Sequence, residues 1–279
     1  MAQKYFDPKP TRYPFPEQTD QHYLVVKKDR GYVFDESYPY VDESKPFLRK
    51  RKWVNVLLRL IVFPVTRVKL SLRIKGKKNI RKYRDVINKG AIGVSNHVNM
   101  WDYLAILAAL KPKKPAILAW GKNINGESGT LMRLVGGIPI PDHDLKATKV
   151  FLEESENHVK NGGFLQIYAE GSMWEYYAPI RPFKTGAAYF AVKCGRPIIP
   201  MAFSYRKPTK LRRLFGPLGS LTLTIGEPIY PNPDLKGQRA QDELTIRVHD
   251  EVCRLASIEP EKNPYGALFH NDKRVDYYQ

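Results

Sequence analysis

The chain has 279 residues, of which 43% are hydrophobic, and a formal net charge of +18. This composition excludes an intrinsically disordered protein and is sufficient for one large hydrophobic core. The charge favours a polyanionic partner, for which nucleic acid, an anionic bilayer surface and an acidic carrier protein are the candidates.

Residues 1–44 are predicted to form an extended arm that lies on the rest of the protein. They are rich in Tyr and Pro, and the segment YLVVKKDRGYVFDESYPYV reads as two short strands around the turn KDRG. The first residues, MAQKYFDPKP, lack the basic and then apolar order of a signal peptide, so export is not expected.

Residues 45–69 are predicted to form a basic amphipathic helix. Basic residues but no acidic ones occur from Lys45 to Ile80, and apolar residues recur at helical spacing while Asn55 and Arg59 fall on the other side. The apolar run LIVFPV is far shorter than the roughly 20 residues of a spanning helix, and Pro64 interrupts it. The residues expected at a membrane interface are Arg49, Lys50, Arg51, Lys52, Trp53, Leu57 and Leu60.

Two alternatives compete with an interfacial helix. The helix could instead pack on the domain and expose a charged side to water, which is the commoner fate of amphipathic helices. We favour the membrane interface because the basic residues cluster beside Trp53. Nucleic acid is disfavoured, since the basic residues alternate with aliphatic side chains instead of aromatic ones and no nucleic-acid-binding motif is present.

From residue 70 to 256, short apolar runs alternate with helical patterns. The runs LSLRI, AIGVS, AILAW, FLQIYA, PIIPMAF and LTLTIG are predicted strands, and DYLAILAAL, LKATKVFLEESENHVKNGG and TGAAYFAVKCG are predicted helices, with Gly162 as a C-cap. This alternation predicts an α/β fold, with a single mixed, mostly parallel sheet flanked by helices. Residues 257–279 form a polar and aromatic tail to which we assign no role.

The segment VSNHVNMWDY contains a candidate catalytic pair. His97 follows the carboxyl end of a predicted strand, and Asp102 begins the next predicted helix five positions later. In one continuous helix that spacing would separate the two side chains, so they meet only if the chain bends between them. A carboxylate that accepts from one imidazole nitrogen leaves the other free to take a proton. The alternative is that Asn96 or Asp102 caps the helix and His97 is an ordinary loop residue.

A second polar segment follows the strand FLQIYA. Glu170, Gly171 and Ser172 lie there, and Arg181 and Lys184 precede a helix whose amino end could receive an anion. The alternative is a turn with a helix cap. Cys194 and Cys253 are the only cysteines, without CxxC spacing, and no cluster has metal-ligand spacing. We therefore expect no disulfide, a reducing compartment and no metal.

Several ordered blocks resemble the glycerolipid acyltransferase family, typified by bacterial 1-acyl-sn-glycerol-3-phosphate acyltransferase. The blocks are NHVNMWD, GGIPI, YAEGS, FKTGAA and RPIIPMAF, followed by a final strand LTLTIGEPI, and the resemblance covers about residues 70–256. It implies that His97 is a general base oriented by Asp102 and that an acyl group passes directly from acyl-CoA or acyl-carrier protein, with no metal or other cofactor. It further implies that Glu170, Gly171 and Ser172 lie near the acceptor and Pro200 near the acyl site. We also expect Asn96, Arg181 and Lys184 to contact the substrate.

Two positions depart from that family. Asp142 and Met173 stand where it usually has arginines that are thought to contact the acceptor phosphate. Arg181, Lys184 or Lys146 would then replace them, or the acceptor has no phosphate at that site. We expect a peripheral enzyme on the cytoplasmic face of the cell membrane that acylates a lysophospholipid, with lysophosphatidic acid as the first candidate. The alternatives are a different lipid acceptor, a non-catalytic membrane-binding relative and a basic nucleic-acid binder.

Overall fold

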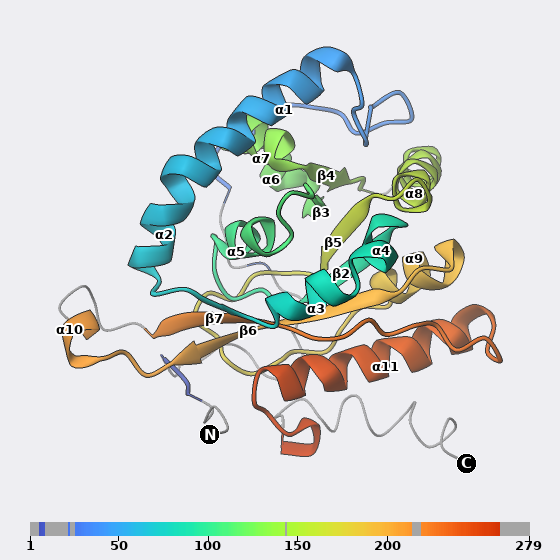
Figure 1. The fold of residues 1–279 in the computed structure, drawn as a ribbon. Coiled ribbons are helices and arrows are strands. Elements are labelled where there is room, and N and C mark those ends of the chain that lie inside the picture. The colour runs from blue at the N-terminus through green and yellow to red at the C-terminus, as the bar shows by residue number, and fades with distance from the viewer. Residues whose placement is uncertain (1–5, 9–21, 23–25, 143, 214–218, 263–279) are drawn as a thin grey trace.

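The fold is built on one seven-stranded sheet, in the order β1-β7-β6-β2-β5-β3-β4. A computed structural model describes residues 6–8, 22, 26–142, 144–213 and 219–262 (Figure 1). The strands are β1 Arg73–Lys75, β2 Ala91–Ser95, β3 Ala116–Trp120, β4 Gly137–Ile140, β5 Phe164–Tyr168, β6 Ile198–Arg206 and β7 Ser220–Ile225. The β6 and β7 pair is antiparallel and the other pairs are parallel. The predicted fold class is confirmed.

The helices alternate with these strands along the chain. They are α1 Lys45–Leu57, η1 Leu58–Val62, α2 Phe63–Lys69, α3 Lys77–Lys82, α4 Arg84–Asn88, α5 Asp102–Ala109, α6 Gly121–Asn125, α7 Gly129–Val135, α8 Leu145–Lys160, α9 Gly186–Cys194, α10 Lys210–Arg213, α11 Gly237–Leu255 and η2 Pro260–Lys262. The start of α8 has a local cause, since the Asp144 carboxylate accepts from the backbone N–H groups of Lys146 and Ala147.

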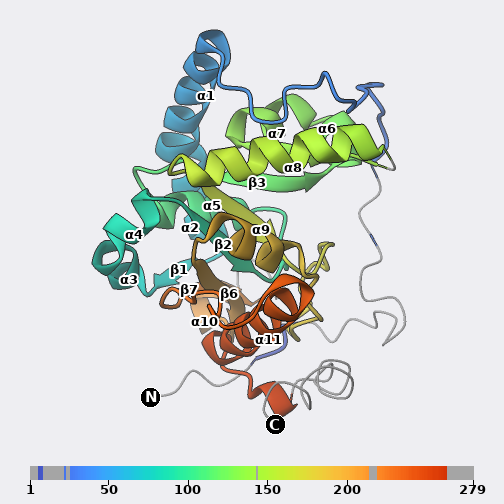
Figure 2. The ribbon, with the colours of Figure 1, turned by 90° about the vertical axis from the view of Figure 1, so that its right-hand side faces the viewer.

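Helices cover both faces of the sheet (Figure 2), and a hydrophobic layer lies between the helices and the strands on each face. On one face, Phe151 of α8, Phe190 of α9 and Leu244 of α11 pack against apolar side chains of β2 and β5. On the other face, Ile106 of α5 and Ile87 of α4 pack against the strands. Because both faces are covered, β2 is buried at every position, as a continuous apolar run predicts.

The basic segment forms a nearly continuous helix at the edge of this core. It runs through α1, η1 and α2, and η1 is a π-helical turn that directly precedes the turn containing Pro64. The helix therefore continues past Pro64, contrary to the break expected there, since a π turn accommodates a missing N–H donor. Within the described residues, every helix is too short or too polar to cross a bilayer.

The N-terminal arm differs from its prediction in one respect. Residues 26–44 hold no strand, so the expected strand pair around KDRG is wrong for this part. Hydrogen bonds to α6 and α7 replace sheet pairing: Tyr32 and Asn125 exchange two, and the Arg30 guanidinium donates to Thr130 and to the carbonyl of Glu127. The rest of the predicted arm, residues 1–5, 9–21 and 23–25, lies outside the described residues, as does the tail beyond 262.

Candidate active site

The two polar segments singled out in the sequence meet because their strands are neighbours. β2 and β5 pair in parallel, with Ser95 opposite Tyr168 at their carboxyl ends. The loop that contains His97 and the loop that contains Glu170 therefore leave the same edge of the sheet side by side. Two further backbone bonds hold the loops together, since Trp174 N–H donates to the carbonyl of His97 and Tyr176 N–H to that of Val98.

The chain bends between His97 and Asp102 and brings their side chains into contact. Asp102 is the first residue of α5, and its Oδ2 lies 3.0 Å from Nδ1 of His97. The same oxygen accepts from the backbone N–H groups of Val98 at 2.8 Å and Asn99 at 3.0 Å. These two bonds fold the loop around the carboxylate, which is the physical reason that residues five positions apart can pair.

The environments of the two side chains differ. Asp102 is fully buried, whereas 23% of the His97 side chain is exposed. Burial raises the pKa of Asp102, while hydrogen bonds from His97, Val98 and Asn99 act in the opposite direction. An ionised Asp102 fixes the proton of a neutral His97 on Nδ1 and leaves Nε2 as an acceptor. This arrangement can remove a proton from a hydroxyl group placed against Nε2.

Tyr168 supports the imidazole from beneath. Its ring stacks on that of His97, with centroids 3.9 Å apart and planes 14° from parallel. Burial raises the pKa of Tyr168 well above its ordinary value, so the hydroxyl stays neutral, and the buried oxygen has no hydrogen-bond partner among the described residues. Sequence reasoning missed Tyr168, although its place at the end of β5, opposite Ser95, was a usable signal.

A buried ion pair braces the second loop. Glu170 Oε2 accepts from the backbone N–H of His97 at 3.0 Å and from Nη2 of Arg181 at 2.9 Å, and its Oε1 accepts from the Arg181 N–H at 2.8 Å. Arg181 also donates to the hydroxyl of Ser172 at 2.7 Å and lies over the Trp174 ring. Only 1% of each charged side chain is exposed. Glu170 and Arg181 therefore hold the loops in place and do not line the cavity, which differs from the expected substrate contact.

Asn96 and Pro200 also lie apart from the cavity. The Asn96 amide donates to the carbonyl of Phe203 and accepts from its N–H, which ties the loop after β2 to β6. Pro200 is a buried β6 residue in register with Val94. We had expected both to contact substrate, but in the structure they fix the backbone beneath the site.

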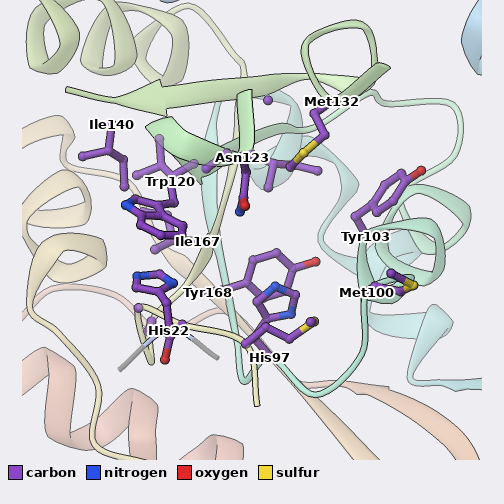
Figure 3. Close-up of a pocket in the computed structure, with 18 of the residues that line it drawn as sticks. His22, His97, Met100, Tyr103, Trp120, Asn123, Met132, Ile140, Ile167 and Tyr168 are labelled. Carbon is purple, nitrogen blue, oxygen red and sulfur yellow. The ribbon is translucent and has the colours of Figure 1, made fainter. Parts of the chain in front are cut away.

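A cavity of about 660 Å³ opens beside His97 (Figure 3). Its walls are mainly apolar and aromatic, and come from α5, α7 and the strands β3, β4 and β5. His22 of the arm stacks on Trp120 across the cavity from His97, with ring centroids 4.0 Å apart. Further lining residues that the sequence did not single out include Met100, Trp101, Tyr103, Met132 and Ile140. The volume and lining suit an organic ligand with a long apolar part.

The cavity contains few charged groups. Gly171, Ser172 and Lys184 line it, and so do Asp142 and Met173. Among the described lining residues, Lys184 is the only lysine or arginine, and Lys146 is not among them. No three His, Cys, Asp or Glu side chains within the described part gather closely enough to hold a metal ion.

Comparison with known proteins relates part of the chain to a protein family. Residues 71–204 match the protein-family model described as Acyltransferase. Over these residues, which are just under half of the chain, the sequence is similar to that family. The matched segment includes His97, Asp102 and the whole loop after β5, in which Glu170 and Arg181 lie. A comparison with curated protein sequences gave no match.

A solved structure has a fold similar to that of this chain. The structure is that of the 1-acyl-sn-glycerophosphate (LPA) acyltransferase PlsC from Thermotoga maritima, to which the chain is similar with a TM-score of 0.52 and 21% sequence identity. The match covers 78% of this chain and 83% of that chain. At this identity the likeness concerns the fold.

The helix formed by α1, η1 and α2 turns its apolar side outward. Trp53 is 68% exposed, Leu57 53% and Leu60 72%, and they continue into a stripe with Val56, Ile61, Val65 and Val68. Asn55 and Leu58 are buried on the opposite side. Arg49, Lys50 and Lys52 are exposed, whereas Arg51 turns inward and donates to the carbonyl of Pro115 at 2.9 Å. An exposed apolar stripe with a polar residue on the packed side is the reverse of an ordinary surface helix.

Proposed function

We propose that the protein is an O-acyltransferase that moves a fatty acyl group from acyl-CoA or acyl-carrier protein to the hydroxyl of a lysophospholipid. The observation that carries the proposal is the His97 and Asp102 pair, in contact at 3.0 Å beside the apolar cavity. The proposed working parts are an arm at 1–44, a membrane-associating helix at 45–69, an acyltransferase domain at 70–256 and a tail at 257–279.

In the proposed reaction, His97 Nε2 takes the proton of the acceptor hydroxyl while the oxygen attacks the thioester carbonyl. The new C–O bond forms, the C–S bond breaks, and the departing thiolate receives the proton from the imidazolium. Asp102 holds the ring and stabilises its positive charge in the transition state. A positioned base of this kind contributes a factor of about 10² to 10⁴ in rate, and the cavity walls contribute positioning.

The membrane part of the proposal rests on the apolar stripe. Seven exposed apolar side chains lie along α1, η1 and α2 and are bordered by exposed cations. Such a helix lies in the interface with its apolar face among the acyl chains. We therefore propose a peripheral enzyme at the cytoplasmic face of the cell membrane, where both the acceptor and long-chain donors are found.

The first candidate acceptor is 1-acyl-glycerol-3-phosphate, which would give phosphatidic acid, with Lys184 as the cation nearest to its phosphate. A second candidate, an acceptor without a phosphate monoester, is favoured by Asp142 in the cavity lining and by the burial of Arg181. Competition between phosphate-bearing and phosphate-free lysolipids in one assay separates the two. Preference for the phosphate-free acceptors would exclude lysophosphatidic acid.

His97→Ala tests the catalytic proposal. We expect turnover to fall at least about 100-fold, the lower bound for losing a general base, with thermal unfolding close to that of the wild type. His158→Gln is the control, because His158 lies outside the cavity. This variant should keep the wild-type activity at neutral pH. Normal turnover by His97→Ala would exclude the base. Absence of acceptor-dependent thiol release from acyl-CoA in the wild type would favour a non-catalytic relative.

A further inference from the structure

A cluster of cations lies where α1 and η1 meet the loop after α5. Arg51 Nη2 donates to the carbonyl of Pro115 at 2.9 Å, which holds this loop beneath the helix, and Lys114 directly precedes that proline. Burial lowers the pKa of Lys114, and the positive charges of Arg51, Arg59 and Lys52 lower it further. We refer to these four residues as the α1 cation cluster. The sequence did not predict it, because Lys114 is far from the others along the chain.

The α1 cation cluster lacks a negative partner. In the described structure none of its members forms an ion pair. Nε of Arg51 and both Nε and Nη2 of Arg59 are buried without a hydrogen-bond partner in the same part of the chain. Partly buried guanidinium groups with unused donors are costly, because neither water nor protein replaces their lost hydration. An anion at the exposed edge of the cluster would offset part of this cost through its charge.

The position of the cluster indicates where that anion comes from. Arg59 is adjacent to Leu60, which is 72% exposed, and Lys52 is adjacent to Trp53, which is 68% exposed. Leu60 and Trp53 belong to the apolar stripe. If the stripe is inserted among the acyl chains, the lipid headgroups lie beside the helix, at the level of Arg59 and Lys52. Arginine is suited to phosphate because its fixed fork of donors matches two phosphate oxygens.

We propose that the α1 cation cluster binds the phosphate group of an anionic phospholipid in the membrane on which the helix lies. The inference rests on the proposed interfacial placement of the helix. The site is separate from the acceptor site, since none of the four residues lines the cavity beside His97. Lys114 extends the contact from the helix to the acyltransferase domain, so one bound lipid would hold both against the bilayer.

Vesicle binding by the full-length protein tests the proposal. The vesicles are phosphatidylcholine alone and phosphatidylcholine with phosphatidylglycerol in equal proportions. The cluster variants are Arg59→Gln, Lys114→Gln and the double variant, and Arg67→Gln, an exposed cation on the same helix, is the matched control. A cation near an anionic surface contributes about 1 kcal/mol, or about fivefold in affinity, which is the loss expected for Arg67→Gln.

We expect each cluster variant to lose about 25-fold in affinity for the mixed vesicles, because a charge-assisted hydrogen bond is lost in addition to the general attraction. The double variant should lose no more than about 50-fold, since both residues contact one phosphate. Binding to phosphatidylcholine alone should be unchanged. Without vesicles, Arg59→Gln should unfold at a higher temperature than the wild type, because it removes an uncompensated charge.

Losses equal to that of Arg67→Gln would overturn the proposal. Displacement from the mixed vesicles by inorganic phosphate, beyond that by chloride at equal ionic strength, is expected of a phosphate site. Binding of inorganic phosphate alone as tightly as the mixed vesicles would overturn the lipid assignment. Turnover of a water-soluble short-chain acceptor should be the same in the cluster variants and the wild type. If no acceptor is turned over by any variant, the proposed reaction fails while the vesicle result still decides the phosphate site.

Discussion

Glu170→Gln should destabilise the protein strongly, because Glu170 neutralises a guanidinium that is buried with it. The carboxylate receives three hydrogen bonds, two at Oε2 and one at Oε1. A glutamine that keeps its carbonyl at the Oε2 position directs its NH₂ group at the N–H of Arg181. At least one hydrogen bond and the counter-charge are then lost. Breaking a buried ion pair by removing one partner costs about 3 to 5 kcal/mol.

Urea unfolding followed by tryptophan fluorescence measures this loss. The matched control is Glu153→Gln, whose carboxylate is 61% exposed and lies 3.9 Å from Lys149; an exposed pair of this kind contributes only about 0.3 to 0.5 kcal/mol. Replacing Glu170 and Arg181 together by Leu and Met should cost less than Glu170→Gln alone. An equal effect of Glu170→Gln and Glu153→Gln would refute the reasoning.

The kinetics of Glu170→Gln distinguish a role in positioning His97 from direct contact with the substrate. Glu170 positions the backbone of His97, so we expect kcat to fall while KM for the acceptor stays near the wild-type value. A rise in KM with unchanged kcat would instead indicate direct contact with the acceptor.

Three further predictions concern single side chains. Burial lowers the pKa of His158 from 6.5 to about 4. As the pH drops between these two values, His158 binds a proton in the unfolded chain but not in the folded protein. The free energy of unfolding therefore falls, by about 3 kcal/mol in total. Urea unfolding at the two ends of this pH range should show that His158→Gln loses less stability in acid than the wild type. Equal losses in the variant and the wild type would contradict the prediction. Tyr168→Phe removes a buried hydroxyl without a partner but keeps the ring stack, so thermal unfolding should show a gain of about 1 kcal/mol; a loss would indicate that the hydroxyl is hydrogen-bonded. Leu60→Glu should weaken vesicle binding by about 30-fold, corresponding to about 2 kcal/mol for one buried leucine. Leu145→Glu, at a side chain 88% exposed on α8, should leave binding unchanged, and equal losses would exclude the stripe as the contact.

Most strands of the sheet were predictable because they are short apolar runs. The predicted runs AIGVS and AILAW coincide with β2 and β3. β4 and α11 were not predicted as elements. The GIPI of β4 is short and contains a proline, and the charged surface of α11 obscures its apolar side, where Leu244, Val248 and Val252 are buried. β4 is a strand because it pairs with β3, and such pairing cannot be read from the periodicity of the sequence.

The site was predictable only in part. Sequence patterns show where polar residues occur along the chain but not whether their side chains are buried. Spacing showed only that His97 and Asp102 could meet if the chain bent between them, and the resemblance to the acyltransferase family implied that they do. The burial of Arg181 did not, since a lone arginine before a helix reads as an available cation. Its partner Glu170 lies eleven positions earlier, and the two meet only because the loop after β5 folds back on itself. The stacking of Tyr168 on His97 likewise depends on the register between β2 and β5.

The helix with the apolar stripe and the cavity share one wall. Leu58, on the packed side of the helix, belongs to a small core with Leu104, Leu107 and Val135. Val135 also lines the cavity, as does Tyr103, which packs against the same core. Only one layer of side chains therefore separates the surface proposed to face the bilayer from the space proposed to hold an acyl chain. A lipid substrate would then travel a short distance to reach His97, and a substitution at Leu58 should alter both vesicle binding and acceptor KM.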